Sequence, residues 1–276
     1  MTVASDAAMT AVVAAWHPAR RDQSLTKRYN VAARAWHGKV EKLGYIDAYG
    51  SLIANGEKPL AASLCQGSLS VLDAGAGTGA FTLALVRWLS RVSPRTNVSI
   101  DLLDPSQAML SEAINNLASD GYRVRGLCQY IRSLPEQIRT YDVVLCGHVI
   151  EHSTNPEREL SILKSVLKPS GVLFLTMTKP SWLTRLLQLR WQHGAFDELS
   201  ATQLLCAAGF QCIESFSFPK GPPMLTSRGF IAVAPCDGHE PGGLRFEEPH
   251  PTWRRPSLGQ TLRRLLLLAL FFGRKF

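Results

Sequence analysis

The residues best suited to hold a ligand lie in a glycine-rich segment, residues 71–79, which reads VLDAGAGTG. It joins an apolar run typical of a strand to an apolar segment typical of a helix. Gly75 and Gly77 let the backbone turn sharply, and a ligand can lie against them without meeting a Cβ. The next apolar run ends at Asp104, 27 residues after Gly77. Ligands of open α/β sheets bind at the carboxyl ends of the strands, so Asp104 is placed to accept hydrogen bonds from both ribose hydroxyls of an adenosine.

Two kinds of ligand fit this pattern. Residues 75–80 also satisfy the dinucleotide pattern G-x-G-x-x-A, and a nicotinamide cofactor would place its pyrophosphate at the helix N-terminus. S-adenosyl-L-methionine has no pyrophosphate and carries an ammonium and a sulfonium. Asp73, directly before the glycine turn, favours a cationic ligand and repels a pyrophosphate. The residues therefore favour S-adenosyl-L-methionine over a dinucleotide.

Several segments together resemble a known family. They are Leu72–Gly79, Asp104, Tyr141–Val144 and Leu167–Gly171. In combination they resemble class I S-adenosylmethionine-dependent methyltransferases. Val149–His152 is similar to the Glu-His pair of a small-molecule branch that includes ubiquinone-biosynthesis O-methyltransferases. The resemblance covers about residues 64–235 and implies an α/β, Rossmann-like methyltransferase fold, with a mostly parallel sheet, helices on both faces and a C-terminal antiparallel hairpin.

The resemblance also implies cofactor-binding roles. Gly75, Ala76 and Gly77 would pass under the methionine part of the cofactor, with Asp73 near its ammonium. Asp104 would bind the ribose. The full set of cofactor-binding residues implied in this way is Tyr29, Asp73, Gly75, Ala76, Gly77, Asp104, Pro105, Tyr130, Ile131 and Gly147.

Two parts of this set, residues 130–131 and the N-terminal Tyr29, lie outside the glycine turn. The family often has an Asp after the third strand, near the adenine amine, where this chain has Tyr130-Ile131. Tyr130 is therefore expected to cover the ring face, unless the alignment slips by one residue. Tyr29 and Trp36 resemble the aromatic N-terminal cover of the family.

Candidate catalytic residues follow the fourth expected strand. Methyl transfer from a sulfonium needs an aligned acceptor and the exclusion of water, and a hydroxyl or ammonium acceptor also needs a base or a metal. His148, next to Gly147, is the best-placed base; the alternative is a loop histidine that only shapes the pocket. His193, in the insertion at residues 179–198, is a second candidate or an ordinary solvated histidine. For the Glu151-His152 pair we favour structural hydrogen bonding over a divalent cation, and we predict no metal site.

These residues must be positioned by alternating strands and helices. Short apolar runs alternate with helix-length segments from about residue 69 to residue 177, which is the signature of βαβ units and a parallel sheet covered on both faces. Residues 25–54 have helical periodicity. Residues 210–218 and 229–234 are expected to pair antiparallel. Asn155-Pro156 begins a helix that Pro169–Gly171 stops, and Ser200 with Gln203 predicts a capping box.

The chain thus divides into an N-terminal helical cap (1–63), a cofactor-binding domain (64–236) and a linker with a basic apolar C-terminal helix (237–276). The net charge is +8; residues 251–276 contain six Lys and Arg and no Asp or Glu, so the excess charge lies in the tail. No apolar stretch reaches the roughly 20 residues that span a bilayer. Six cysteines without a C-x-x-C pair, and no basic residue before the N-terminal apolar stretch, indicate a cytoplasmic protein.

Two apolar segments lie outside the expected core. Residues 179–198 are dense in Leu and Trp and predict a wall for an apolar acceptor, with a packed helix as the alternative. Residues 260–276 contain eight consecutive apolar residues with basic flanks. This pattern is typical of a helix in the interface of an anionic membrane, at its inner face, or of one docked on the protein itself or on a second subunit.

The leading hypothesis is methyl transfer to a small, apolar or lipid-like acceptor at O, N or C. The alternative is a non-catalytic module that binds the same cofactor and is anchored through its tail. A nucleic-acid methyltransferase is disfavoured, because Cys146–Val149 replaces the Asn/Asp-Pro-Pro-Tyr turn and the basic charge is confined to the tail. A dehydrogenase is disfavoured further, because Asp73 would repel a pyrophosphate.

Overall fold

The computed structural model describes residues 18–135, 140–181, 184 and 194–236. The chain divides into two units, residues 1–237 and 238–276, and every described residue lies in the first. His193, most of the insertion at 179–198 and the expected C-terminal helix lie outside the described residues, so the predictions made for them stay predictions.

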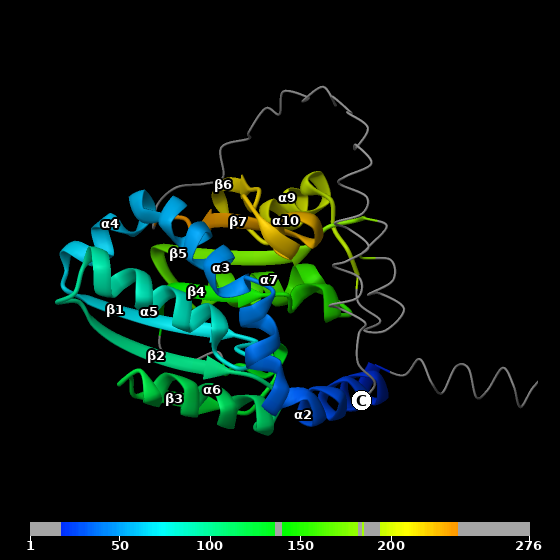
Figure 1. Cartoon of the computed structure of the whole chain (residues 1–276). Helices are drawn as coiled ribbons and strands as arrows, with labels where there is room; N and C mark the ends of the chain where they lie inside the picture. Colours follow the sequence, from blue (N-terminus) through cyan, green and yellow to red (C-terminus); the bar gives the residue numbers. More distant parts are fainter. Residues whose placement is uncertain (1–17, 136–139, 182–183, 185–193, 237–276) are drawn as a thin grey trace, which may run out of the picture. The chain divides into compact units, whose positions relative to one another are not determined.

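A seven-stranded sheet with the order β3-β2-β1-β4-β5-β7-β6 forms the centre of the described unit (Figure 1). Strands β1 to β5 pair in parallel, whereas β7 pairs antiparallel with both β5 and β6. The strands are β1 (Ser68–Ala74), β2 (Asn97–Leu103), β3 (Val124–Leu127), β4 (Tyr141–Gly147), β5 (Leu167–Thr178), β6 (Gln211–Phe216) and β7 (Ser227–Val233). The expected fold class is confirmed, including the antiparallel C-terminal pair.

Alternating side chains of the central strands feed two hydrophobic clusters, one on each face. In β4, Val143 and Leu145 enter the first cluster, while Val144 and Cys146 enter the second. The first cluster also contains residues from α3 (Tyr45–Asn55), α4 (Glu57–Cys65), α5 (Ala80–Val92) and α6 (Gln107–Ser119). The second contains residues from α7 (Pro156–Ser165) and α9 (Glu198–Ala207). Helices therefore cover both faces.

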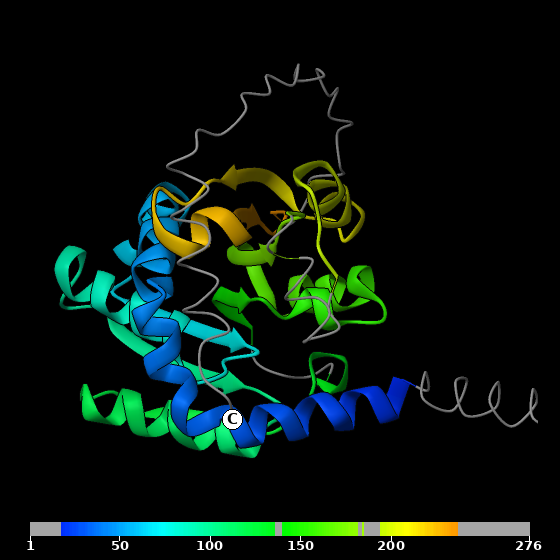
Figure 2. The ribbon, with the colours of Figure 1, turned by 45° about the vertical axis from the view of Figure 1, so that its right-hand side comes forward.

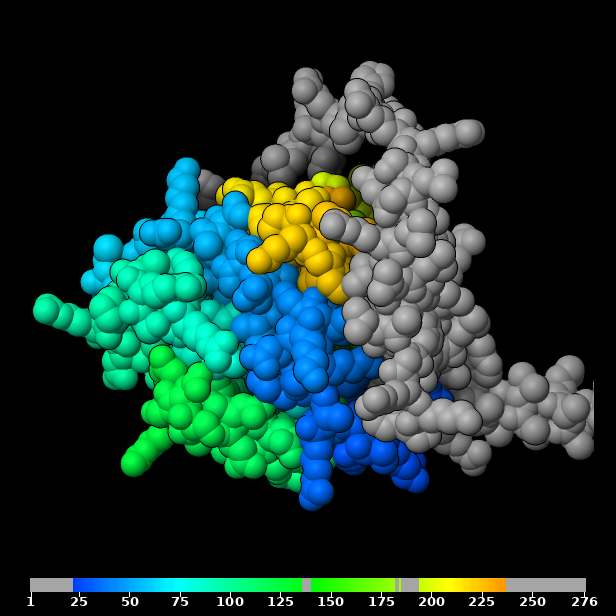
Figure 3. Space-filling model, viewed as in Figure 1, coloured from blue at the N-terminus to red at the C-terminus, as the bar shows by residue number. Residues whose placement is uncertain are grey.

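The N-terminal region forms more than one helix. α2 (Pro18–Lys42) contacts α6 near its N-terminal end (Figure 2) and is separated from α3 by Gly44, whose φ of 79° is left-handed. Gly is the residue that adopts this conformation most readily, and it allows the chain to change direction there. In Figure 3 the side chains of α2 and α3 lie between those of α5 and α6 and those of α10 (Gly221–Thr226).

Local boundaries confirm some expectations and correct others. Asn155 caps α7, because its Oδ1 accepts the Arg158 N–H at 3.1 Å. The predicted capping box at Ser200 is wrong: Asp197 caps α9 by accepting the Ser200 N–H at 2.8 Å. α7 ends at Ser165, and Pro169–Gly171 lies inside β5, so these residues do not stop the helix. No helix among the described residues is long and apolar enough to cross a membrane.

Candidate functional site

The glycine turn follows β1 at the carboxyl edge of the sheet. Gly75 and Gly77 have φ values of 78° and 52°, a region that L-residues rarely adopt. The backbone N–H groups of Gly75 and Ala76 donate to the Leu103 carbonyl at 2.7 and 2.9 Å, tying the turn to the end of β2. A Cβ on Gly75 would lie 2.1 Å from Val149 Cγ2, whereas a Cβ on Gly77 would meet nothing within 4 Å. Gly75 is therefore required by packing, and Gly77 faces open space.

Asp104 meets this turn directly. Its Oδ2 accepts the Gly77 N–H at 2.9 Å, and its Oδ1 accepts the Ser106 N–H at 2.8 Å. Burial raises the pKa of the Asp104 carboxyl to about 6, although the hydrogen bonds from Ser106 and Gly77 lower it. Each carboxylate oxygen can accept a further hydrogen bond. The following residue, Pro105, accepts the Cys128 thiol at its carbonyl.

Asp73 is buried beneath the turn. Its Oδ2 accepts the hydroxyl of Thr82 at 2.6 Å and the backbone N–H of Thr82 at 3.2 Å, which braces the first turn of α5. Burial raises the pKa of Asp73 to about 7, against the hydrogen bonds from Thr82 and together with the charge of Asp104. Asp73 thus has a structural contact that sequence reasoning missed, and its role toward a ligand stays a prediction.

Two other buried carboxylates, Asp142 and Asp101, differ from Asp73 and Asp104 because each has a basic side chain as partner. Asp142 accepts Lys168 Nζ at 2.9 Å, and despite burial the pKa of Asp142 is lowered by Ser70 and Lys168. Asp101 forms an ion pair with Arg125 at 2.6 Å. Within the described part of the chain, no basic side chain forms such a pair with Asp73 or Asp104. The glycine turn is therefore flanked by carboxylates whose negative charge is not matched by a basic side chain of that part.

Helix α2 reaches the loops that follow three strands. Thr26 Oγ1 lies 3.1 Å from the Tyr130 hydroxyl, Asn30 accepts the Ser106 hydroxyl at 2.6 Å, and the Tyr29 hydroxyl lies 3.3 Å from His152 Nε2. Burial, followed by the charges of Asp104 and Glu151, raises the pKa of Tyr29. The structure thus brings Tyr29 to the predicted site.

The segment after β3 presents two different side chains. The Arg132 guanidinium lies over the Tyr130 ring at 4.0 Å, while Ile131 is buried in the second cluster. Trp36 packs edge-on against Tyr29 with ring centroids 5.6 Å apart. The two aromatic residues expected in the N-terminal cover therefore contact each other.

His148 directly follows β4 in a strained conformation. Its φ is 58°, an uncommon value outside glycine, and its N–H donates to the Thr176 carbonyl at 2.8 Å. Its Nδ1 lies 2.9 Å from Glu151 Oε1 and its Nε2 lies 3.2 Å from Ser227 Oγ. A Cβ on the preceding Gly147 would lie 3.2 Å from both Phe81 and the Tyr49 hydroxyl. The backbone here is held tightly from two sides.

Glu151 is the residue that sequence reasoning left as structural. It lies in the short 3₁₀ helix η2 (Ile150–His152) and is 3% exposed. Its Oε1 accepts the N–H and the hydroxyl of Thr178 at 3.0 and 2.7 Å. Burial raises the pKa of Glu151, but the hydrogen bond and attraction from His148, with smaller effects of His152 and Thr178, lower it to about 2. Glu151 is therefore an ionised, buried partner of His148.

The carboxyl edge of the sheet also contains buried polar atoms without a hydrogen-bond partner among the described residues. They are Thr78 Oγ1, Glu151 Oε2 and Thr176 Oγ1. Thr78 lies in the glycine turn, and Thr176 pairs with Gly147 in the sheet. Unsatisfied buried oxygens are rare in folded proteins, so a ligand with hydrogen-bond donors fits this edge. No group of three or more His, Cys, Asp or Glu within the described ranges could hold a metal ion.

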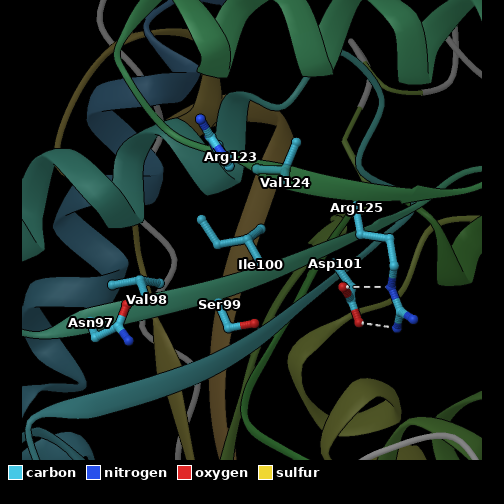
Figure 4. A pocket seen from close by; sticks show the side chains of 8 residues that line it. All are labelled: Asn97, Val98, Ser99, Ile100, Asp101, Arg123, Val124 and Arg125. Carbon is cyan, nitrogen blue, oxygen red and sulfur yellow. Dashed lines mark hydrogen bonds and ion pairs between the residues drawn. The ribbon is translucent and has the colours of Figure 1, made fainter.

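A separate hollow of about 570 Å³ lies along β2 and β3. It is lined by Asn97–Asp101 and Arg123–Arg125, and the Asp101–Arg125 ion pair lies at one end (Figure 4). None of the predicted site residues lines it. The candidate site is therefore placed at the glycine turn and His148, where the predicted residues lie.

Comparisons with known proteins decide the family. A family model described as a methyltransferase domain matches residues 38–215. The chain belongs to the methyltransferase domain family. This confirms the resemblance found in the sequence, and the match includes the glycine turn, Asp104 and His148.

Individual curated relatives match a smaller part of the chain than the family model does. The ubiquinone biosynthesis O-methyltransferase of Coxiella burnetii is 26% identical over 106 residues, 38% of this chain and 42% of that protein. A malonyl-[acyl-carrier protein] O-methyltransferase of Halalkalibacterium halodurans is 30% identical over 140 residues, 49% of this chain and 46% of that protein. The chain thus spans less than half the length of these two curated relatives.

Solved structures share the fold. The S-adenosylmethionine-dependent methyltransferase of Clostridium acetobutylicum superposes with a TM-score of 0.53 at 16% identity, over 73% of this chain and 98% of that one. The magnesium protoporphyrin IX methyltransferase of Synechocystis, solved with bound SAH, gives a TM-score of 0.53 at 21% identity, over 69% and 84% of the two chains. At these identities the likeness establishes the Rossmann-like methyltransferase fold.

Proposed function

We propose that this chain transfers a methyl group from S-adenosyl-L-methionine to an oxygen of a small, apolar acceptor, and that His148 takes the acceptor's proton. The observation that carries the proposal is the pair of buried carboxylates, Asp73 and Asp104, beside an open glycine turn and without basic partners among the described residues. A cationic nucleoside with ribose hydroxyls supplies the charge and the donors that this edge lacks.

Further support comes from the relatives and from the site. Both curated relatives described above are named as O-methyltransferases, which favours an oxygen acceptor. The apolar character follows from the Leu- and Trp-rich residues 179–198 in the sequence. The role of His148 is supported by its place beside Gly147 and by its buried carboxylate partner Glu151.

The remaining cofactor contacts follow from position. The residues that would hold the cofactor are Gly75 and Gly77 against its methionine part, Asp104 at its ribose, and Tyr130 or Ile131 near its adenine. When bound, the cofactor supplies an activated methyl group on sulfur. This chain's own residues bind it, align the acceptor and hold the proton.

Calorimetry followed by product analysis tests the proposal. The full chain is titrated with S-adenosyl-L-methionine and with NADH, then incubated with the trideuteromethyl-labelled donor and two probes, an alkyl-substituted catechol and an alkyl monocarboxylic acid. We expect the sulfonium donor alone to bind and a labelled methyl ether or ester to form. Tighter binding of NADH would overturn the cofactor assignment. Binding without label in either probe or in a bacterial extract would instead favour the non-catalytic module.

A further inference from the structure

Both ring nitrogens of His148 are occupied by side chains of this protein. Nδ1 lies 2.9 Å from Glu151 Oε1, and Nε2 lies 3.2 Å from Ser227 Oγ. An ionised carboxylate only accepts hydrogen bonds, so Nδ1 must be the nitrogen that carries hydrogen. In a neutral imidazole Nε2 is then the acceptor, and the Ser227 hydroxyl donates to it.

The hydroxyl of Ser227 continues into a chain of hydroxyls. Ser227 Oγ lies 3.1 Å from Thr226 Oγ1, and the Tyr45 hydroxyl lies 2.9 Å from Thr226 Oγ1 and 3.5 Å from Ser227 Oγ. Thr226 Oγ1 also donates to the Pro222 carbonyl at 3.0 Å. Tyr45 comes from α3, whereas Thr226 and Ser227 lie where α10 meets β7.

The three hydroxyls of Tyr45, Thr226 and Ser227 can satisfy the hydrogen bonds of the His148 ring in both of its protonation states. With a neutral ring, the donors run from Tyr45 to Thr226, then to Ser227 and to Nε2. With a protonated ring, Nε2–H donates to Ser227, Ser227 donates to Thr226, and Thr226 donates to the Pro222 carbonyl. Each hydroxyl has one hydrogen and two lone pairs, so once Nε2 has gained its proton, rotation of the hydroxyls is enough to reach the second arrangement.

Two members of this network, Tyr45 and His148, are partly exposed, and both ring nitrogens of His148 are already bonded to side chains. Ser227 and Thr226 are 1% and 2% exposed, while Tyr45 is partly exposed. The Tyr45 ring also packs edge-on against the His148 ring, with centroids 5.6 Å apart. Burial raises the pKa of Tyr45, although the hydrogen bonds with Ser227 and Thr226 lower it. Tyr45 therefore keeps its proton at neutral pH, and its hydroxyl ends the series that begins at His148 Nε2.

We propose that Tyr45, Thr226 and Ser227 relay the proton of a hydroxyl acceptor to His148 Nε2. This inference rests on the proposed function and deepens it. The acceptor O–H gives its proton to Tyr45, whose own proton passes to Thr226; the proton of Thr226 passes to Ser227, and that of Ser227 passes to Nε2. The acceptor oxygen forms its bond to the methyl carbon as the carbon–sulfur bond of the donor breaks. The imidazolium left behind is stabilised by the Glu151 carboxylate.

Two catechols of different acidity test the relay with Ser227→Ala and Tyr45→Phe. An alkylcatechol is protonated at neutral pH, whereas 4-nitrocatechol is largely ionised and needs no base. We expect kcat with the alkylcatechol to fall about 10- to 100-fold in both variants, with KM nearly unchanged, and kcat with 4-nitrocatechol to stay within about twofold. Ser227→Thr, which restores a hydroxyl, should recover activity, and Ser215→Ala on the neighbouring β6 is the matched control. Equal losses with both catechols, or no loss with either, would overturn the relay.

A measurement without turnover separates this inference from the proposed function. Nitrogen-15 NMR of the full chain with labelled histidine reports which ring nitrogen of His148 carries hydrogen. We expect the Nδ1–H tautomer, and a shift of the Nε2 resonance in Ser227→Ala but not in Ser215→Ala. A neutral ring with hydrogen on Nε2 would overturn the relay even if methyl transfer is found. Failure of the chain to bind the sulfonium donor would overturn the proposed function while leaving the tautomer result in place.

Discussion

The two glycines of the turn should respond differently to the same substitution, because one faces a neighbour and the other faces open space. In Gly75→Ala the new Cβ would lie 2.1 Å from Val149 Cγ2, and overpacking of this kind typically costs about 1–3 kcal/mol. The left-handed backbone adds about 1 kcal/mol. We therefore expect the free energy of unfolding to fall by about 2–4 kcal/mol, a decrease in Tm of roughly 5–15 °C.

In Gly77→Ala the new Cβ meets no neighbour, so only the cost of the left-handed backbone remains. The free energy of unfolding should therefore fall by only about 1 kcal/mol. Its new Cβ, however, enters the space in which the methionine part of the donor is proposed to lie. We expect Kd for S-adenosyl-L-methionine to rise at least about tenfold, or about 1.4 kcal/mol. Thermal unfolding without ligand and calorimetry with it measure the two effects. Wild-type affinity in Gly77→Ala would refute the placement of the ligand, and wild-type stability in Gly75→Ala would refute the packing argument.

Three other predictions concern charge. Asp104→Asn removes the negative charge and leaves one oxygen where Asp104 uses two, so one of the Gly77 and Ser106 N–H groups loses its acceptor. We expect Kd for the sulfonium donor to rise about 10- to 100-fold by calorimetry, and the free energy of unfolding to fall by about 1–3 kcal/mol; unchanged affinity would contradict the ribose assignment. The pKa of Asp73 is about 7 in the folded state, above its unfolded value, so the folded protein takes up a proton before the unfolded chain does as pH falls. The free energy of unfolding, measured with urea, should therefore rise by up to about 1.4 kcal/mol for each pH unit between about pH 7 and pH 4. Asp73→Asn should flatten this slope. Removal of residues 252–276, which contain the basic apolar segment, should reduce co-sedimentation with anionic liposomes; equal sedimentation of both forms would end the membrane hypothesis.

Much of the fold could be predicted because parallel strands buried on both faces leave a simple pattern. The apolar run ending at Asp104 and the one ending at the glycine turn became β2 and β1, which are neighbours in the sheet. Strand ends of a parallel sheet share one edge, so order and spacing placed Asp104 and the glycine turn at the same edge; the hydrogen bond from the Gly77 N–H to Asp104 was not predicted.

The environment of His148 could not be predicted in the same way. Tyr45 and Ser227 are 182 residues apart, and periodicity indicates which face a side chain takes but not which distant polar groups meet on it. At α9, Asp197 and Ser200 are both good capping residues three positions apart, and the sequence contains no term that ranks them. At Gly44 a signal was present, since a glycine after an apolar helical run often ends a helix.

The charges of the site discriminate between the two ligands that the glycine turn allows. A unit charge about 4–6 Å from a carboxylate interacts with it by about 3–4 kcal/mol at an effective dielectric constant of about 20. Asp101 and Asp142 already have Arg125 and Lys168 as cationic partners, so a ligand would gain little from them. Asp73 and Asp104, with raised pKa values of about 7 and about 6, would each be stabilised by a sulfonium or an ammonium by an amount of this order. A pyrophosphate at the same place would favour the protonated carboxyl groups, and because their pKa values are already raised to about 7 and about 6, that protonation costs little near neutral pH. The preference for a cationic ligand is therefore no more than about 3–4 kcal/mol for each carboxylate.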